Sequence, residues 1–298
     1  MQKVLITGSS GFTGGHLIHQ LSQIPSVQIV GIDLFPKHFI TEYKMDILQK
    51  KELSRIMNNE QPDVVIHLSG ITKSDNFQDY YKSNVYSTIN VLDSIVENNL
   101  NNCKILLASS SAVYGTTKSP ILKEEGILCP INFYGNSKVA MEYVAAQYIR
   151  NFSLIINIVR PFNIIGQGQS TSFVIPSFAS QLLAIKKNNT NSEINVGNLQ
   201  AIRDFVDITD VVNAYWQIIN SQVQGEIFNI ASGKPNRIED ILKEMIRILD
   251  LNVKIITDPS RIVKQEIPEQ IGDIQKITSL GWRPQISIEE SLKKILEL

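Results

Sequence analysis

The sequence has little excess charge, few cysteines and no long apolar run. Its 298 residues carry 28 Lys and Arg against 29 Asp and Glu, so we expect neither nucleic acid nor an anionic membrane as the main partner. Cys103 and Cys129 form no CxxC pair and no Cys/His cluster, which favours free thiols in a reducing compartment and predicts no metal site. No apolar stretch reaches the ~20 residues of a membrane span, and we expect neither an export signal nor a membrane anchor. These absences predict a cytoplasmic protein with small-molecule partners.

The apolar residues that are present follow an alternating pattern. Short, continuously apolar runs at 4–7, 28–32, 64–68, 104–109 and 154–159 alternate with segments in which apolar residues recur every three or four positions. This alternation predicts an α/β fold, with a doubly wound parallel sheet that is buried on both faces by helices. After Pro161 the rhythm changes to a Gly/Gln/Ser stretch and a helix-like segment at 174–187, which indicates a second, smaller unit.

A glycine-rich stretch, TGSSGFTG at 7–14, lies between the first apolar run and a helix-like segment. Glycines at this place let the backbone turn tightly and approach a pyrophosphate, whose charge then lies at the helix N-terminus. The predicted cofactor contacts in this stretch are Gly8, Ser10, Gly11, Phe12 and Thr13. Taken alone, the glycines also fit an ordinary strand-to-helix turn.

Asp33 strengthens the prediction of a dinucleotide site. It ends the second apolar run, at about the ~20-residue spacing where a carboxylate accepts hydrogen bonds from the adenosine ribose hydroxyls. Its charge repels a 2′-phosphate, so NAD(H) is favoured, while Lys37 and His38 keep NADP(H) as the alternative. Taken alone, Asp33 also fits a solvated loop carboxylate.

Three polar residues form the predicted catalytic group. Tyr134 and Lys138 stand in a YxxxK spacing, which places both side chains on one helix face a turn apart. An ammonium beside a phenol favours phenolate, so we expect Lys138 to lower the pKa of Tyr134 and to allow proton exchange with a sugar oxygen. Ser110 follows a buried strand and would lie at the sheet edge where ligands bind, although a serine there also fits a simple turn.

The order of these motifs resembles that of the extended short-chain dehydrogenase/reductases. The motifs are TGSSGFTG, HLSG at 67–70, SSSAVYG at 109–115, YGNSK at 134–138 and RPFNIIGQGQ at 160–169. The resemblance covers nearly the whole chain and implies a Rossmann domain, 1–166 with 204–231 returning to it, and a nucleotide-sugar domain, 167–203 and 232–298. It gives Ser110, Tyr134 and Lys138 the catalytic roles. The further cofactor contacts that it implies are Asp46, Ile47, Leu68, Ser69, Gly70, Tyr134, Lys138 and Pro161.

The downstream stretches at 166–182 and 196–215 are similar to the GDP-4-keto-6-deoxy-D-mannose reductases and the related GDP-mannose 4,6-dehydratases. The resemblance implies that Asn163 and Arg203 reach the substrate diphosphate, as amide and guanidinium donors can. An ion pair of Arg203 with Asp204 or Asp207 is the alternative for that side chain. The remaining implied substrate contacts are Ser110, Ser111, Phe173, Val174, Val196, Arg261 and Glu266.

Two positions depart from the pattern of these families. The dehydratases carry an acidic residue two positions before the Tyr of SxxxYG, where this chain has Ala112. Without that carboxylate, elimination of water lacks its acid/base, so redox chemistry at C4 is favoured over dehydration. Near the C-terminus Arg261 and Glu266 keep their places, but Val263 and Lys264 replace an RP pair, which weakens the assignment of the base to guanine.

The resemblance therefore implies an NAD(P)H-dependent reduction of an NDP-4-keto-6-deoxyhexose, with the GDP sugar preferred. The main alternative is an NAD-dependent 4-epimerase or 4-dehydrogenase of a nucleotide sugar. A 4,6-dehydratase and a non-catalytic dinucleotide sensor are less favoured. By analogy with related enzymes, a homodimer would form through helices at 80–94 and 134–149, although the apolar faces of these helices also fit a core.

Overall fold

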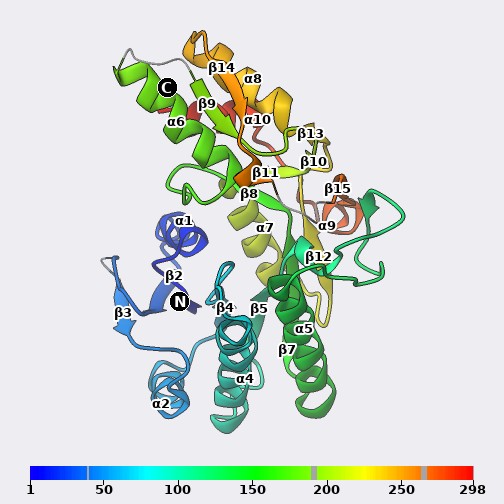
Figure 1. Cartoon of the computed structure of the whole chain (residues 1–298). Helices are drawn as coiled ribbons and strands as arrows, with labels where there is room; N and C mark the ends of the chain where they lie inside the picture. Colours follow the sequence, from blue (N-terminus) through cyan, green and yellow to red (C-terminus); the bar gives the residue numbers. More distant parts are fainter. Residues whose placement is uncertain (39, 189–192, 263–266, 298) are drawn as a thin grey trace.

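A parallel sheet forms the centre of the molecule (Figure 1). The computed structural model describes residues 1–38, 40–188, 193–262 and 267–297. Within them, seven strands pair in the order β12-β7-β5-β4-β1-β2-β3, and each adjacent pair is parallel. The strands are β1 (Gln2–Thr7), β2 (Val27–Asp33), β3 (Thr41–Lys44), β4 (Val64–His67), β5 (Lys104–Ala108), β7 (Ile155–Pro161) and β12 (Ile227–Ile230). The predicted α/β fold of the Rossmann type is confirmed, and the strand order reverses at β1, where such sheets open a ligand crevice.

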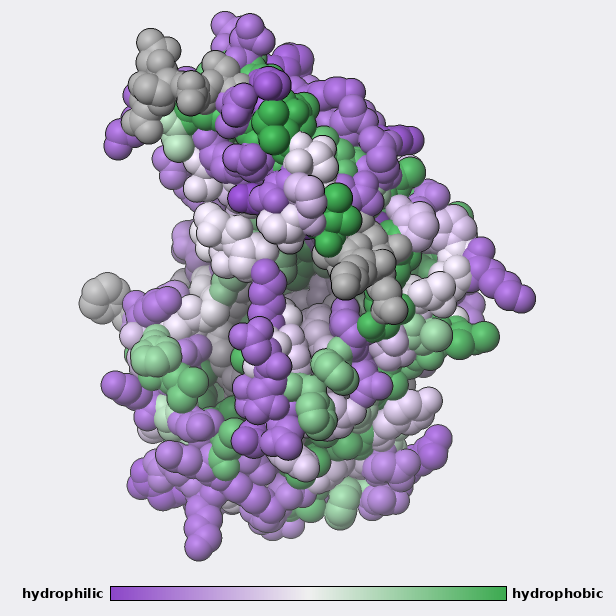
Figure 2. Space-filling model, viewed as in Figure 1, coloured by the Kyte–Doolittle hydropathy of each residue, from purple (hydrophilic) through white to green (hydrophobic). Residues whose placement is uncertain are grey.

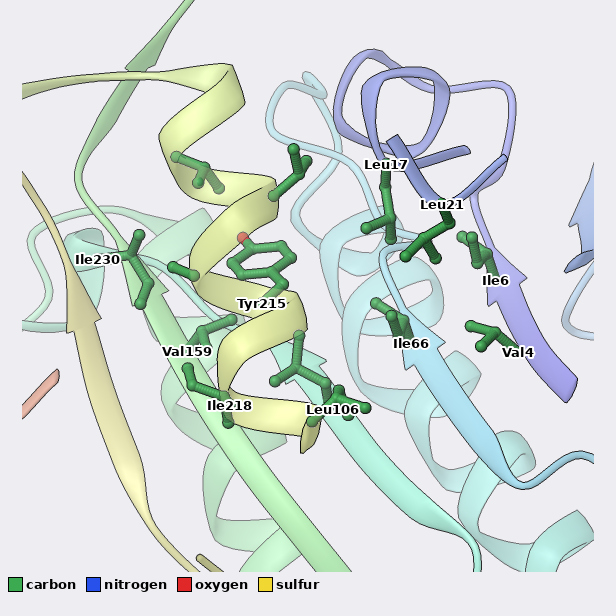
Figure 3. Close-up of a cluster of buried hydrophobic side chains, with 14 of the residues drawn as sticks. Val4, Ile6, Leu17, Leu21, Ile66, Leu106, Val159, Tyr215, Ile218 and Ile230 are labelled. Atoms are coloured by element: carbon green, nitrogen blue, oxygen red, sulfur yellow. The ribbon is translucent and has the colours of Figure 1, made fainter. Parts of the chain in front are cut away.

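Helices cover both faces of the sheet, which explains why its central strands are continuously apolar. Val4 and Ile6 of β1 pack with α1 (Phe12–Leu21) and α7 (Ile208–Asn220). Leu5 points to the opposite face, against α2 (Lys50–Glu60), α4 (Ser87–Glu97) and α5 (Phe133–Phe152). Figure 3 shows Tyr215 and Ile218 of α7 lying over the first of these faces, with the Tyr215 hydroxyl toward the carboxyl ends of the strands.

The C-terminal part of the chain returns to this first face. Ile277 of α9 (Gln275–Ser279) and Trp282 are buried in the same apolar cluster as α1 and α7, and Trp216 packs against it. The indole N–H of Trp282 donates to the Asp210 carbonyl at 3.1 Å. Ile277 and Trp282 lie in the range 232–298 that the resemblance assigns to the second domain, yet their contacts are with the first.

The second unit lies above the carboxyl ends of the sheet strands (Figure 1). Its helices α6 (Val174–Asn188), α8 (Ile238–Leu249) and α10 (Ile288–Ile295) share an apolar core with strand β9 (Glu193–Val196). Strand β14 (Lys254–Thr257) pairs in parallel with β9. Figure 2 shows hydrophilic side chains over much of the outer surface of both units. The shorter elements between the units are β6 (Ile121–Leu122), β8 (Asn163–Ile165), β10 (Ile202–Arg203), β11 (Phe205–Asp207), β13 (Asn236–Arg237) and β15 (Glu269–Gly272).

Asp204 ties the two units together at their junction. Its carboxylate accepts hydrogen bonds from the backbone N–H groups of Ser232 at 2.8 Å, Gly233 at 2.9 Å and Gly272 at 3.1 Å. Burial raises the pKa of Asp204, while these hydrogen bonds lower it. Because a buried carboxylate needs several donors, the junction has one well-defined geometry.

Most expected elements appear within a few residues of their predicted positions, including α6 and the strands β1, β2, β4, β5 and β7. The strand β3 was not predicted, because its sequence TEYK is polar and short. A search of the described residues finds no helix with the length and apolar character needed to cross a bilayer.

Candidate active site

A cavity of about 570 Å³ opens at the carboxyl ends of the strands, beneath the second unit. Fourteen of the predicted site residues line it: Gly8, Gly11, Phe12, Thr13, Leu68, Gly70, Ser110, Ser111, Tyr134, Lys138, Pro161, Asn163, Phe173 and Val174. The lining also includes residues that were not predicted, among them Lys73, Asn84, Tyr215 and Gln270. The fold thus brings the glycine-rich loop, the YxxxK pair and the RPFN segment to one place.

The glycine-rich loop is packed so closely that it needs its glycines. Gly8 has a φ of +71°, and a Cβ on it would lie 2.9 Å from the Ser69 backbone nitrogen. A Cβ on Gly14 would overlap the backbone of Gly8 and Ser9. Gly11 is the N-cap of α1 and has no side chain to cap the helix. The first N–H groups of α1, whose first residues line the cavity, therefore have no side-chain acceptor from the N-cap. This arrangement fits the pyrophosphate of a dinucleotide.

The Asp33 carboxylate lies beside this loop, as predicted. It accepts a hydrogen bond from the Ser10 backbone N–H at 3.0 Å and another from the Phe35 N–H at 2.9 Å. Asp46 accepts from the Leu48 N–H at 2.9 Å, and Ile47 packs against the α2 side of the sheet. Of these residues, none lines the cavity itself, so the ribose and adenine contacts predicted for them would lie at its outer end.

The three predicted catalytic residues meet on the cavity floor. Asn132 caps α5 by accepting the Gly135 N–H at 2.8 Å, and Tyr134 and Lys138 follow in its first turns. The Lys138 ammonium donates to the carbonyl of Ala108, at the end of β5, at 2.7 Å. Ser110 does cap the turn after β5, since its hydroxyl accepts the Ala112 N–H at 3.1 Å, and it also hydrogen-bonds to the Tyr134 phenol.

The pKa of Tyr134 differs from our expectation. Burial raises it above its ordinary value of 10, and only the hydrogen bond with Ser110 opposes this. The expected lowering of this pKa by Lys138 does not appear in the chain alone: burial dominates, and the ammonium is not among the groups that shift this pKa. Burial also lowers the pKa of Lys138 to about 8, while the nearby Glu142 carboxylate raises it.

A buried ion pair supports the floor from behind. The guanidinium of Arg160 donates to both carboxylate oxygens of Glu142, at 3.0 and 2.6 Å. The same carboxylate accepts the hydroxyl of Ser109, which precedes Ser110, and Arg160 also donates to the Tyr114 hydroxyl at 3.0 Å. The pair therefore connects the ends of β5 and β7 with α5, one turn after Lys138.

Asn84 is a site residue that the sequence did not reveal. It lies in a π-helical turn (Tyr81–Tyr86), a distortion that often marks functional sites. Its amide accepts the Ile71 N–H at 3.0 Å and donates to the Ser137 hydroxyl at 2.9 Å. A Cβ on Gly70 would overlap its side-chain oxygen. Asn84 thereby holds the loop after β4 against α5.

The upper wall of the cavity comes from the second unit. Phe173 and Val174, at the start of α6, line the cavity with 40% of each residue exposed. Asn163 lines it as well, and its amide donates to the Asp204 carbonyl at 2.9 Å. Lys73 reaches across from the first unit and donates to the Ser172 carbonyl at 3.2 Å.

Three other predicted substrate residues, Val196, Arg203 and Arg261, do not line the cavity. Val196 is 1% exposed in the core of the second unit, and Arg261 forms an ion pair with Asp258 at 3.4 Å. The guanidinium of Arg203 donates to the Ile202 carbonyl at 2.9 Å, and Arg203 pairs in register with Gln270, which does line the cavity. Glu266, with Val263 and Lys264, lies outside the described residues.

Comparison with known proteins decides the family. The family profile described as GDP-mannose 4,6 dehydratase matches residues 5–295. The GDP-6-deoxy-D-mannose reductase of Pseudomonas aeruginosa is 32% identical over 99% of this chain and 96% of its own. The chain belongs to the GDP-mannose 4,6-dehydratase family. This family is part of the extended short-chain dehydrogenase/reductases, so the predicted membership is confirmed.

A second relative and a solved structure are similar to this chain over most of their length. The GDP-6-deoxy-D-talose 4-dehydrogenase of Aggregatibacter actinomycetemcomitans is 30% identical over 93% of this chain and 90% of its own. The solved structure of RMD from Pseudomonas aeruginosa complexed with NADPH has a TM-score of 0.89 and 30% identity, and covers 100% of this chain and 98% of that one. The predicted enzyme class, a nucleotide-sugar oxidoreductase with a nicotinamide cofactor, agrees with these relatives.

Proposed function

We propose that this enzyme reduces the C4 keto group of an NDP-4-keto-6-deoxyhexose, with GDP-4-keto-6-deoxymannose as the preferred substrate. One observation carries the proposal: Ser110 and Tyr134 lie together on the cavity floor, and Ala112 lines the cavity where a dehydratase would need a carboxylate. Two relatives support it: the Pseudomonas protein is a GDP-6-deoxy-D-mannose reductase, and the Aggregatibacter protein is a GDP-6-deoxy-D-talose 4-dehydrogenase.

The electrostatics of the floor suit the reductive direction. Reduced nicotinamide, when bound, supplies a hydride to the carbonyl carbon. Because burial raises the pKa of Tyr134, its phenol keeps its proton at neutral pH and can donate it to the C4 oxygen. The Ser110 hydroxyl donates a hydrogen bond to the same oxygen, and the Lys138 ammonium stabilises the phenolate that remains. The proposed cofactor contacts are the predicted ones, headed by Gly8, Gly11 and Asp33.

The test uses purified protein with GDP-4-keto-6-deoxymannose and either NADH or NADPH. We expect the absorbance of the reduced nicotinamide to fall in proportion to the sugar consumed, and to stay constant when the sugar is omitted. No loss of absorbance with this sugar and with its dTDP equivalent would refute the proposal.

A second candidate is a 4-dehydrogenase or 4-epimerase, and the name of the Aggregatibacter relative favours it. A 4-dehydrogenase would raise the absorbance when a GDP-6-deoxyhexose is mixed with NAD. An epimerase would retain NAD through purification and consume none. A non-catalytic sensor is the weakest candidate, and in that case the Tyr134→Phe variant would keep its biological activity.

We also propose that the enzyme is a cytoplasmic homodimer that pairs through α4, α5 and the π-helical turn. Tyr86 and Tyr143 on these elements are 55% and 66% exposed. Light scattering on the purified protein reads the mass directly, and a monomer at micromolar concentration would contradict the pairing. The proposed domain boundaries are those of the sequence, with α9 and Trp282 packing on the first domain.

A further inference from the structure

The carboxylate of Glu42 accepts four hydrogen bonds beside the glycine-rich loop. One oxygen accepts from the hydroxyls of Ser9 and of Ser10, the latter at 3.1 Å. The other oxygen accepts from two consecutive backbone N–H groups, those of Lys37 at 2.9 Å and His38 at 3.1 Å. Neither the sequence motifs nor the catalytic proposal uses this residue.

The register of the sheet places Glu42 on the same side as Asp33. Glu42 pairs with Gly31 of β2, and Asp33 is two residues further along that strand. Residues two apart on a strand share a face, as do residues directly opposite each other on neighbouring strands. Gly31 makes room for this arrangement, since a Cβ on it would lie 2.9 Å from both Glu42 Cγ and the Ser9 hydroxyl oxygen.

Ser10 joins the two carboxylates. Its backbone N–H donates to Asp33 and its hydroxyl donates to Glu42. In Rossmann folds the acidic side chain at the position of Asp33 binds the 2′-hydroxyl of the adenosine ribose. The 2′-phosphate of NADP(H) would therefore lie next to Asp33. Only Ser10 separates that position from the four donors around Glu42.

Two consecutive backbone N–H groups with nearby hydroxyls form an anion-binding site. Here the chain's own carboxylate fills it. We propose that Glu42, acting with Asp33, makes this enzyme specific for NAD(H), because it occupies the donors that a 2′-phosphate would need and adds a second negative charge beside them. The inference rests on the dinucleotide binding proposed above and names Glu42 as a specificity-determining residue.

The surroundings also predict what happens when Glu42 is removed. The Lys37 and His38 amides and the two serine hydroxyls would then be free to bind a phosphate. Lys37 is exposed next to them, and Lys44 pairs in register with Asp33. A Glu42→Ser change would thus empty an anion-binding site that the Glu42 carboxylate now fills. Lys37 and Lys44 would lie at the edge of this site.

The experiment measures binding of NADH and NADPH to the purified full-length protein by nicotinamide fluorescence, with no sugar present. We expect the wild type to bind NADH on the order of a hundredfold more tightly than NADPH, because the carboxylates of Asp33 and Glu42 would both repel the 2′-phosphate. Glu42→Ser is expected to narrow the ratio by about tenfold or more, through tighter binding of NADPH. Glu42→Gln keeps the shape of the side chain and removes its charge, so it should narrow the ratio of NADH affinity to NADPH affinity by a smaller factor.

Glu60→Gln is the matched control, since this carboxylate binds Lys3 and Tyr43 away from the loop and should leave the ratio unchanged. Displacement of NADH by adenosine 2′,5′-bisphosphate, weak in the wild type and stronger in Glu42→Ser, gives an independent reading. Equal binding of both dinucleotides by the wild type, or an unchanged ratio in both Glu42 variants, would overturn the inference and leave the proposed function standing. Failure to bind either dinucleotide would overturn both.

Discussion

The floor and the upper wall of the cavity are built in different ways. On the floor, Lys138 is 6% exposed and its ammonium has a backbone acceptor, while Glu142 and Arg160 behind it are buried and paired. On the wall, Val174 is the first residue of α6 and Phe173 precedes it, and 40% of each residue is exposed. The proposed catalytic groups are thus part of a buried polar network, whereas the groups proposed to contact the nucleotide lie on the surface of a separate core. Substitutions in the two regions should therefore fail in different ways.

Breaking the network behind the floor should have the largest effect. Glu142→Ala leaves the Arg160 guanidinium buried without its carboxylate, and we expect a loss of about 3–5 kcal/mol of unfolding free energy. Urea unfolding measures it. Because an apolar pair of similar size often replaces a buried ion pair at little cost, Glu142→Leu with Arg160→Met is the control and should recover most of the loss. A loss below about 1 kcal/mol in the single variant would show that the floor does not depend on this pair.

Removing the proton donor should abolish turnover without disturbing the fold. Tyr134→Phe keeps the ring and removes the phenol, so kcat is expected to fall about 10³-fold while the NADH affinity stays within about threefold. Steady-state kinetics and a fluorescence titration measure the two quantities. Tyr143→Phe, on the exposed side of the same helix, is the control and should retain full kcat. A Tyr134→Phe enzyme with more than a tenth of wild-type kcat would contradict the role of the phenol.

The pH dependence should separate activity from stability. Burial lowers the pKa of Lys138 to about 8, whereas the unfolded chain has the ordinary value of 10.5. Above pH 8 the folded enzyme loses the ammonium that stabilises the phenolate, so kcat/KM for the reduction is expected to fall. Between pH 8 and 10.5 the unfolded state binds more protons than the folded state at this residue, so its contribution to stability rises with pH. A kcat/KM that stays constant to pH 10 would contradict the assignment.

Changes in the wall should have the smallest effect, and mainly on binding. Phe173→Ala removes an exposed ring that contacts only the bound nucleotide in our proposal, so KM is expected to rise about tenfold with kcat within about twofold. Initial-rate kinetics with the GDP and dTDP sugars show whether the loss is the same for both bases. If kcat falls as much as kcat/KM, Phe173 would belong with the floor.

The same difference explains which parts of the site were predictable from sequence. Gly8, Tyr134 and Lys138 stand in local motifs whose spacing has a physical reason, so their meeting in one cavity follows from the parallel sheet. The ion pair of Arg160 with Glu142 could not be predicted from the sequence. The two residues are 18 positions apart, and only the packing of α5 on β7 brings them together. The direction in which the pKa of Tyr134 shifts depends on how deeply the phenol is buried, and a sequence motif does not give that burial.

Glu42 and Asn84 escaped prediction for local reasons. Glu42 lies on β3, whose four residues TEYK show neither an apolar run nor a regular alternation, so no strand and no register could be assigned there. Asn84 lies in a π-helical turn, and no motif in the sequence marks that turn. Both residues accept hydrogen bonds from backbone N–H groups of nearby loops, Glu42 from Lys37 and His38 and Asn84 from Ile71, and no sequence motif records such contacts.

The return of the C-terminal segment to the sheet also determines what light can report about this protein. The chain has two tryptophans, and Trp216 and Trp282 both lie at the apolar cluster between α7 and the sheet. The fluorescence of both indoles should report the unfolding of the first unit, which contains the parallel sheet. It should not respond to rearrangement of α6, α8 and α10 in the second unit. A single indole introduced at Phe178 in α6 of a Trp216→Phe, Trp282→Phe background would give the nucleotide half its own signal, so that the two halves can be watched separately during unfolding or on ligand addition.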